Sequence, residues 1–437
     1  MSAGAVLIGI LVVALGVGFS IGVHELGHMI PAKLFGVRVD KYMIGFGPTL
    51  WSRQIGETLY GLKMLPLGGF CRMVGMLPPA PPGHMPQKGY FGEVVAQARA
   101  ESVDEIIPGE EGRAFYNLSA PKKVLIMAGG ILANLLLAFL FTAVAFSIPT
   151  TQPTNTLASV SECLPQNPLH PTQDCIPAPA AAAGLQVGDT ITQFAGHSIS
   201  TWNQLTAAIA AVPVGETVPL TVSRAGTLLQ LELTPVNVVR AAGFDADGNP
   251  AVGADGIIQT ISGPFIGIGP TVVRQAIPLS QVPRAIGEMM TGTFAAVASF
   301  PVAVYEVARS MITGAPRPGS GVMSVVGVGR AAAEVAGVDA PVGDIVATMF
   351  ALVASLNMAL FAFNLIPLLP FDGGHVVNAI YEGGRRTLAR IRGIRPLPGP
   401  ADVARMLPVA YVVTPLLVLS FLVLIMADVI NPISIFG

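Results

Sequence analysis

The segment His24-Glu25-Leu26-Gly27-His28 carries the side chains of this chain that are best suited to chemistry. On a helix, residues four positions apart share a face, so both imidazoles can reach one metal ion. Glu25 lies beside them, where it can take a proton from an attacking water. The spacing is typical of zinc hydrolases. A short motif can also arise by chance, but the chain has only 6 histidines and two of them fall here.

A third candidate ligand, Asp372, lies near the other end of the chain, after an apolar stretch that two prolines interrupt. A carboxylate at the end of an apolar helix is costly unless a cation pairs with it. Taken alone, the segment is explained more simply as an Asp-Gly-Gly turn at a helix end. Together with His24 and His28, however, Asp372 would complete a set of two imidazoles and one carboxylate, which leaves one tetrahedral position for water.

The composition is that of an integral membrane protein. Of the 437 residues, 52% are hydrophobic and only 11% are charged, whereas a soluble chain has about 25% charged residues. The net charge of −2 and the lack of a basic motif argue against binding to nucleic acid. Four stretches are long enough to cross the bilayer, namely Gly4–Val23, Val124–Ile148, Ile345–Leu369 and Leu407–Met426.

Lysine and arginine residues predict how these spans are oriented. They concentrate in residues 31–123 and 381–405, which we expect to be cytoplasmic, and they are sparse in 149–340, which we expect to lie outside with the N-terminus. The first and third spans then both run from outside to inside. The histidine pair and Asp372 should therefore meet at similar depth, toward the cytoplasmic side of the inner (plasma) membrane.

The segments between these spans suggest smaller elements. Residues 44–76 alternate apolar and polar residues between glycines, which predicts a small sheet or looped hairpin near the membrane. Its edge could pair with an extended substrate, or the hairpin could be purely structural. Pro31 should end or kink the first helix. Residues 77–120 read as a solvated loop that could be partly helical, and Gly129, Gly130 and Asn134 read as helix-packing positions.

Two further stretches, 281–312 and 323–336, are moderately amphipathic. We expect them to lie along the outer membrane interface. A fifth crossing at either stretch would place Asp372 on the wrong side of the membrane.

A soluble domain is predicted after the second span. Residues 184–191 form a turn followed by a strand, 202–211 a short helix, and 218–233 a hairpin. This pattern resembles a PDZ domain. A Pro-rich insertion bracketed by Cys163 and Cys175 falls where the peptide-binding loop is expected, so ordinary binding of a C-terminal carboxylate is in doubt. A disulfide between these cysteines is plausible, but spacing alone cannot fix its geometry. The domain could also be a gate that binds nothing tightly.

The predicted fold class is a multi-pass α-helical membrane protein with a membrane-associated β-hairpin or sheet and an inserted extracytoplasmic PDZ-like α+β domain. The expected divisions are a catalytic half at 1–148, the PDZ-like domain at 149–280 with its core at 156–240, post-PDZ amphipathic helices at 281–340, and a C-terminal membrane half at 341–437.

Taken together, these motifs make the chain similar to the site-2 proteases, a family of intramembrane zinc metalloproteases. It most resembles the PDZ-bearing bacterial branch typified by the regulator of sigma-E protease. The resemblance is carried by HELGH at 24–28, GFG at 45–47, PLGGF at 66–70, the PDZ-like turn, and the segment 364–375 with its N-x-x-P and DGGH motifs. Two features depart from the branch: a single PDZ-like domain where some relatives have two, and the insertion between the cysteines.

The resemblance assigns roles to individual residues. It implies Zn²⁺ as cofactor, His24, His28 and Asp372 as its ligands, and Glu25 as general base. It further implies that Asn364 holds substrate near the metal and that the Gly45-Phe46-Gly47 segment contacts substrate. His375 is not carried over as a ligand.

The resemblance also implies partners. The expected substrates are single-pass membrane proteins of the anti-sigma-factor type, already trimmed by a site-1 protease, and membrane lipid surrounds the enzyme. The PDZ-like domain would then filter substrates by size or read the new terminus. Two alternatives remain: a catalytically inactive PDZ-bearing scaffold or metal-transport component, which the presence of Glu25 disfavours, and a multi-pass zinc protease that uses a glutamate as third ligand.

Overall fold

The computed structural model describes residues 3–80, 89–165, 175–241, 260–314, 317 and 322–433. They fall into two compact units, each described here by itself. One unit is largely helical and comprises Met1–Phe146, Pro278–Asp339 and Ile345–Ile433. The other is a β-rich insertion that comprises Ser147–Ile277 and Ala340–Asp344.

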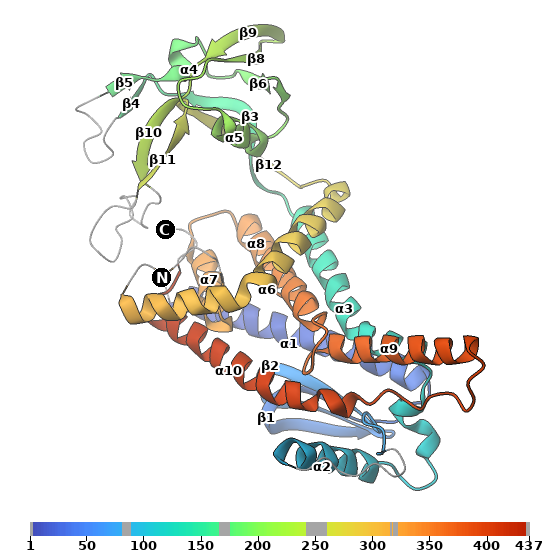
Figure 1. Ribbon diagram of the computed structural model, residues 1–437. Helices are drawn as coiled ribbons and strands as arrows, with labels where there is room; N and C mark the ends of the chain where they lie inside the picture. Colours follow the sequence, from blue (N-terminus) through green and yellow to red (C-terminus); the bar gives the residue numbers. More distant parts are fainter. Residues whose placement is uncertain are drawn as a thin grey trace. The chain divides into compact units, whose positions relative to one another are not determined.

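The helical unit is built around long apolar helices (Figure 1). Within the described ranges, five are long and apolar enough to cross a membrane: α1 (Ala3–Leu34), α3 (Ala120–Ser147), α6 (Val282–Thr313), α8 (Val342–Asn364) and α10 (Leu407–Ile430). Four of them confirm the predicted spans. The fifth, α6, covers the stretch expected to be only amphipathic, and its mean hydropathy of 1.2 is the lowest of the five.

Helix α1 continues past Pro31 to Leu34, so of the two expected effects of Pro31 the end of the helix is wrong, and a kink stays a prediction. A proline inside a helix removes one backbone donor and crowds the preceding turn. Pro31 lies in the last turn of α1, where the missing backbone donor costs the helix little stability. The backbone N–H of Phe35 still donates to the Pro31 carbonyl at 3.0 Å.

The predicted hairpin is present as β1 (Val39–Ile55) and β2 (Thr58–Met73), which pair antiparallel. Irregular register lets residues 41–44 pair on both sides, with 59–62 and with 69–72. The hairpin is fastened to α1, because the Tyr42 hydroxyl donates to the Gly22 carbonyl at 2.7 Å. Residues 69–73 therefore form one edge of this small sheet, beside the helix that carries the histidines.

Shorter helices complete the unit: α2 (Tyr90–Asp104), α7 (Val325–Gly337) and α9 (Asp372–Ile391), with 3₁₀ turns at Glu111–Arg113, Phe115–Asn117, Leu279–Gln281 and Val403–Met406. Helix α2 confirms the partly helical reading of 77–120. The backbones of α1 and α3 touch where Gly27 meets Gly129, since a Cβ added to Gly129 would lie 2.0 Å from the Gly27 carbonyl oxygen. The packing role predicted for Gly129 is thus confirmed.

The insertion is built on a sheet of order β12-β3-β6-β8-β9, with β7 (His197–Ser198) paired to β6. Its main strands are β3 (Thr150–Val160), β6 (Thr190–Phe194), β8 (Val218–Arg224), β9 (Thr227–Leu233) and β12 (Ile268–Gln275). Helix α5 (Trp202–Ala211) buries Leu205 in their core, beside Leu157, Ile191, Phe194 and Leu220. The predicted helix and hairpin are confirmed, but the sheet extends beyond the expected core of 156–240, because β12 pairs with β3 from Thr150 onward.

Smaller elements flank this sheet. They are β4 (Cys163–Pro165) paired with β5 (Cys175–Pro177), the short α4 (Pro179–Ala182), and β10 (Val236–Ala241) paired with β11 (Thr260–Phe265). Cys163 is disulfide-bonded and Cys71 is free. The side chain of Cys175, the partner named in the sequence prediction, lies outside the described residues.

Candidate metal centre

The three predicted ligands meet although 344 positions separate His28 from Asp372 (372 − 28). Asp372 Oδ2 lies 3.1 Å from His24 Nε2 and 3.2 Å from His28 Nε2, and the two Nε2 atoms lie 3.2 Å apart. Ligands about 2.0–2.1 Å from a tetrahedral zinc ion are separated by roughly 3.3 Å. The spacing and the chemistry of these three atoms therefore fit Zn²⁺.

The Nδ1 atoms of both histidines contact residues of α3. His28 Nδ1 donates to the Ile126 carbonyl at 2.8 Å, which leaves Nε2 as the free lone pair that a metal requires. Nδ1 of His24 lies 3.0 Å from the side-chain amide of Asn134, which is fully buried. The metal centre thus has a second layer of contacts that orients both rings.

The amide of Asn134 can be assigned from this geometry. Its carbonyl oxygen has no hydrogen-bond partner among the described residues when the amide nitrogen faces His24. The oxygen and nitrogen of an amide are assigned from their hydrogen bonds. Turning the amide over places Oδ1 against Nδ1–H of His24 and the amide nitrogen at the unpartnered position, and this orientation is the one that frees Nε2 of His24 for the metal. The sequence favoured a packing role for Asn134, and its polarity within an apolar span was the available signal.

Glu25 is buried beside the three ligands, at 8% exposure. The backbone N–H of Cys71 in β2 lies near its carboxylate. Strand β2 can come this close to α1 because residue 69 is a glycine. A Cβ added to Gly69 would lie 2.7 Å from Ile21 Cγ2 and 3.3 Å from Glu25 Cγ. The edge of the β1–β2 sheet therefore reaches the predicted base directly.

The other residues predicted for substrate binding lie at the end of α8 and within β1. Asn364 is the last residue of α8 and is half-buried. Gly45 and Gly47 have φ angles of 93° and 85°, a region that favours glycine, and Phe46 between them is 47% exposed. Their roles in substrate binding stay predictions. His375 lies one turn into α9 and is not part of the cluster that the three ligands form.

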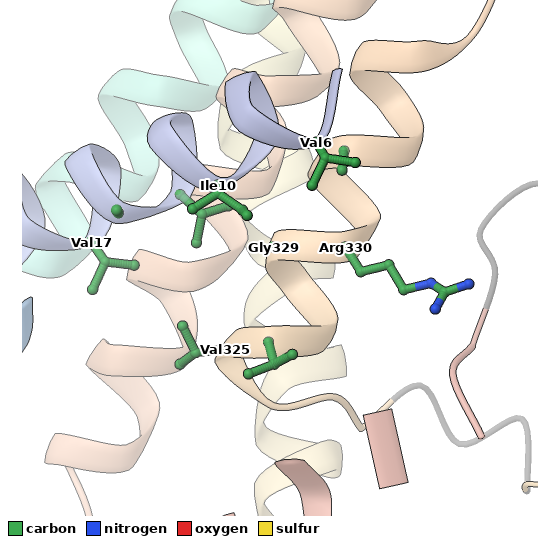
Figure 2. A pocket seen from close by; sticks show the side chains of 10 residues that line it. Val6, Ile10, Val17, Val325, Gly329 and Arg330 are labelled. Carbon is green, nitrogen blue, oxygen red and sulfur yellow. The ribbon is translucent and has the colours of Figure 1, made fainter. Parts of the chain in front are cut away.

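A groove of about 420 Å³ lies between α1 and α7 (Figure 2), and its lining includes neither Glu25 nor the three candidate ligands. Val6, Ile10 and Val17 of α1 face α7, and the Arg330 side chain extends away from α1. The other lining residues are apolar or glycine. The groove holds no group that could perform hydrolysis.

Two histidines and an aspartate that could hold one metal ion, with a glutamate beside them and bilayer-length helices around them, are the arrangement expected of a membrane-embedded metallohydrolase. The sequence matches the model of Peptidase family M50 over residues 12–394, and the chain belongs to this family.

Relatives over nearly the whole chain agree with this family. The chain is 32% identical over 443 residues to zinc metalloprotease Rip1 of Mycobacterium tuberculosis, which covers 98% of each protein. It is 31% identical to Rip1 of Mycolicibacterium smegmatis, over 98% of the chain and 99% of the relative. Zinc metalloprotease RasP of Shouchella clausii is 25% identical, over 83% of the chain and 87% of the relative. The protein is therefore an intramembrane zinc metalloprotease of the site-2 protease type.

Solved structures were also matched, among them the PDZ domain of an SdrC-like protein from Listeria monocytogenes. It shares 18% identity, covers 27% of the chain and 88% of that domain, and has a TM-score of 0.16. At this score the match carries no weight for the insertion.

Proposed function

We propose that this protease cuts the transmembrane segments of single-pass membrane proteins at the centre formed by His24, His28 and Asp372, with Glu25 as general base. The observation that carries the proposal is the meeting of three ligand atoms, each 3.1–3.2 Å from the others, beside a buried glutamate. Such a centre fits peptide hydrolysis and leaves no need for a covalent intermediate.

Zinc, when bound, supplies Lewis-acid polarisation of the peptide carbonyl and lowers the pKa of water at the site. His24, His28 and Asp372 hold the ion through Nε2, Nε2 and Oδ2. Glu25 takes the proton of the attacking water and passes it to the leaving amine nitrogen. The edge of the β1–β2 sheet packs against Glu25, because an added Cβ at Gly69 would lie 3.3 Å from Glu25 Cγ, and this contact limits where the carboxylate can move.

Substrate is delivered as an extended strand along the β2 edge. A helix must unwind before its peptide bonds can be attacked, and an exposed sheet edge captures unwound backbone by hydrogen bonding. Residues 69–73 form the edge that reaches Glu25, while residues 46–55 of β1 are exposed throughout. Asn364 and the Gly45-Phe46-Gly47 segment then contact the substrate near the metal.

The orientation of the membrane helices follows from the number of crossings that the chain makes between α1 and α8. The C-terminal ends of α1 and α8 both reach the metal centre. The two helices therefore cross the bilayer in the same direction. Since α3 crosses in the opposite direction, the chain between α3 and α8 makes no net crossing. The 13-residue α7 spans only about 20 Å, too little to cross alone. Helix α6 therefore lies along the interface or enters and returns with α7. Together with the lysine and arginine distribution, this supports a centre that lies toward the cytoplasm.

The insertion and the N-terminus then lie outside the cell. The insertion acts as a PDZ-like filter that admits single-pass substrates of the anti-sigma-factor type after a site-1 protease has trimmed them. The alternative function is that of a catalytically inactive scaffold. The presence of Glu25 disfavours it, because a scaffold needs no general base.

Glu25→Gln tests the base assignment. The variant should bind zinc and substrate like the parent chain, because the ligand atoms are untouched, and it should fail to cut a single-pass reporter. The measurement pairs zinc content with cleavage of the reporter in membranes. Cleavage at the parental rate would show that Glu25 is not the base.

Asp372→Ala tests the ligand set. Zinc should be lost, because two imidazoles remain where three ligands are required. Full zinc retention after dialysis would favour a third ligand elsewhere, as in the glutamate-liganded membrane proteases.

A further inference from the structure

Helix α9, labelled in Figure 1, carries an apolar face whose side chains are exposed among the described residues. Its five large apolar side chains on this face are 45–77% exposed, namely Val377, Ile380, Tyr381, Leu388 and Ile391. At 100° per residue they fall within about 100° of the helix circumference. The exposure is therefore one continuous stripe.

The opposite side of α9 is fastened to the protein. Glu382 is fully buried, and its Oε2 accepts from Lys123 Nζ at 2.7 Å and from the Ala401 N–H at 3.0 Å. Ala379 and Ala389 are buried on the same side. This attachment fixes the rotation of α9, so the apolar stripe must face away from the helical unit.

The chain around α9 keeps the helix at the membrane. Helix α8 ends at Asn364 and the next candidate span begins at Val403, so both ends of α9 lead directly into bilayer-length helices. Helix α9 itself is absent from the candidate spans, and its charged residues explain why. A helix tethered in this way, with one apolar and one charged side, is suited to lie in the interface.

Three arginines lie at the C-terminal end of the apolar stripe. Arg390, Arg392 and Arg395 are exposed, and none of the three forms an ion pair with a described residue. In contrast, the neighbouring Arg386 is held by Glu382 Oε1 at 2.7 Å and by the Pro398 carbonyl at 3.1 Å. Each basic residue near an anionic leaflet adds about 1 kcal/mol of attraction. The free arginines thus complement anionic headgroups.

We propose that α9 is a lipid-binding helix that docks along the bilayer surface, with its apolar stripe in the acyl region and Arg390, Arg392 and Arg395 on the phosphates of anionic lipids. The occupant is the membrane itself. Because α9 begins at Asp372, the docked helix also supports the third metal ligand, but lipid binding can be measured without any catalysis.

The test uses the full chain reconstituted in phosphatidylcholine vesicles with added phosphatidylglycerol. Leu388→Cys, and separately Ile391→Cys, carry an environment-sensitive fluorophore on the stripe. Ala207→Cys on the exposed side of α5 is the matched control. Background labelling is low, since burial raises the pKa of the Cys71 thiol to about 12 and Cys163 is disulfide-bonded. Quenching is measured with spin-labelled lipid and with aqueous iodide.

Labels at 388 and 391 should be quenched by lipid and protected from iodide, and the label at 207 should show the reverse. Spin-labelled phosphatidylglycerol should quench more strongly than spin-labelled phosphatidylcholine. Replacing all three arginines by glutamine should remove this preference, each arginine accounting for roughly a fivefold change in attraction.

Three outcomes would overturn the proposal. Quenching of 388 and 391 by iodide as strong as at 207 would place the stripe in water. Protection from both quenchers would mean that a protein partner covers it. Equal quenching by the two lipids in the parent chain would remove the role of the arginines.

Discussion

The chemistry of the centre depends on which nitrogen of each imidazole carries a proton. The hydrogen bonds that Nδ1–H of each ring donates to α3 leave both Nε2 atoms free for the metal, and they also prevent the rings from turning in an apolar setting. The contact to Ile126 is a backbone contact that tolerates many side chains. The contact to Asn134 is made by a side chain and can be removed.

Asn134→Leu should therefore weaken zinc binding about 10–100-fold, because His24 Nδ1–H loses its buried acceptor. Zinc affinity is measured by chelator competition on the purified full chain. Asn134→Asp should restore most of the affinity, since it keeps an acceptor at the same place. The matched control is Asn357→Leu, another fully buried amide, which donates to Ser20 Oγ and to the Val353 carbonyl. Equal losses in both leucine variants would show a general packing effect instead.

At the scale of elements, the centre is located by the crossing of α1 and α3. A Cβ added to Gly130 would lie 2.2 Å from His28 Nε2 and 2.6 Å from Cε1 of the same ring. The absence of a side chain at this position thus gives the imidazole its space.

Gly130→Ala should displace the His28 ring and lower zinc affinity by at least about tenfold, with an overpacking cost of about 1–3 kcal/mol. Zinc content and thermal unfolding are measured together. Gly18→Ala in α1 is the control, because an added Cβ there meets nothing within 4 Å. Unchanged zinc affinity in Gly130→Ala would mean that the helices separate without disturbing the ligand.

Much of this arrangement was predictable, and the reasons are physical. The apolar lengths gave four of the spans, and the charge distribution suggested that His24, His28 and Asp372 meet. The contacts from Ile126 and Cys71 were not predictable, because they use backbone atoms that every residue possesses. The lipid-facing stripe of α9 was also not predicted. The arginines of this segment were used only to predict on which side of the membrane it lies. The sheet of the insertion was underestimated because β12 joins it from far along the sequence.

At the scale of the whole molecule, the insertion has its own acid sensitivity. Arg224 donates two hydrogen bonds of 2.7 Å to the buried Asp189, and the pKa of that carboxyl is lowered chiefly by these bonds. A lowered folded-state pKa stabilises the fold above the unfolded value of about 3.9, and this stability is lost as pH falls through the folded value.

Asp189→Asn should therefore lower the melting temperature of the insertion at neutral pH and reduce its further fall below about pH 4. The chain has two tryptophans, so Trp51→Phe leaves Trp202 of α5 as the reporter in the full chain. Parent and variant should converge at acid pH. A constant difference between them at every pH would assign the effect to packing rather than to the charge of Asp189.

The role of the insertion as a filter can be tested by removing it whole. Thr151 pairs with Arg274 across β3 and β12, so residues 152–273 can be replaced by an Asn-Gly turn between neighbouring strands. The junction keeps two contacts, from the Thr151 N–H to Asp344 and from Arg274 to the Pro149 carbonyl. A filter hypothesis predicts that the shortened enzyme binds zinc normally and cuts a single-pass reporter that still bears its outer domain. The parent chain should refuse that reporter and cut only the trimmed form. Because zinc binding reports separately on the membrane unit, a zinc-loaded enzyme that still refuses the untrimmed reporter would show that selection occurs within the membrane.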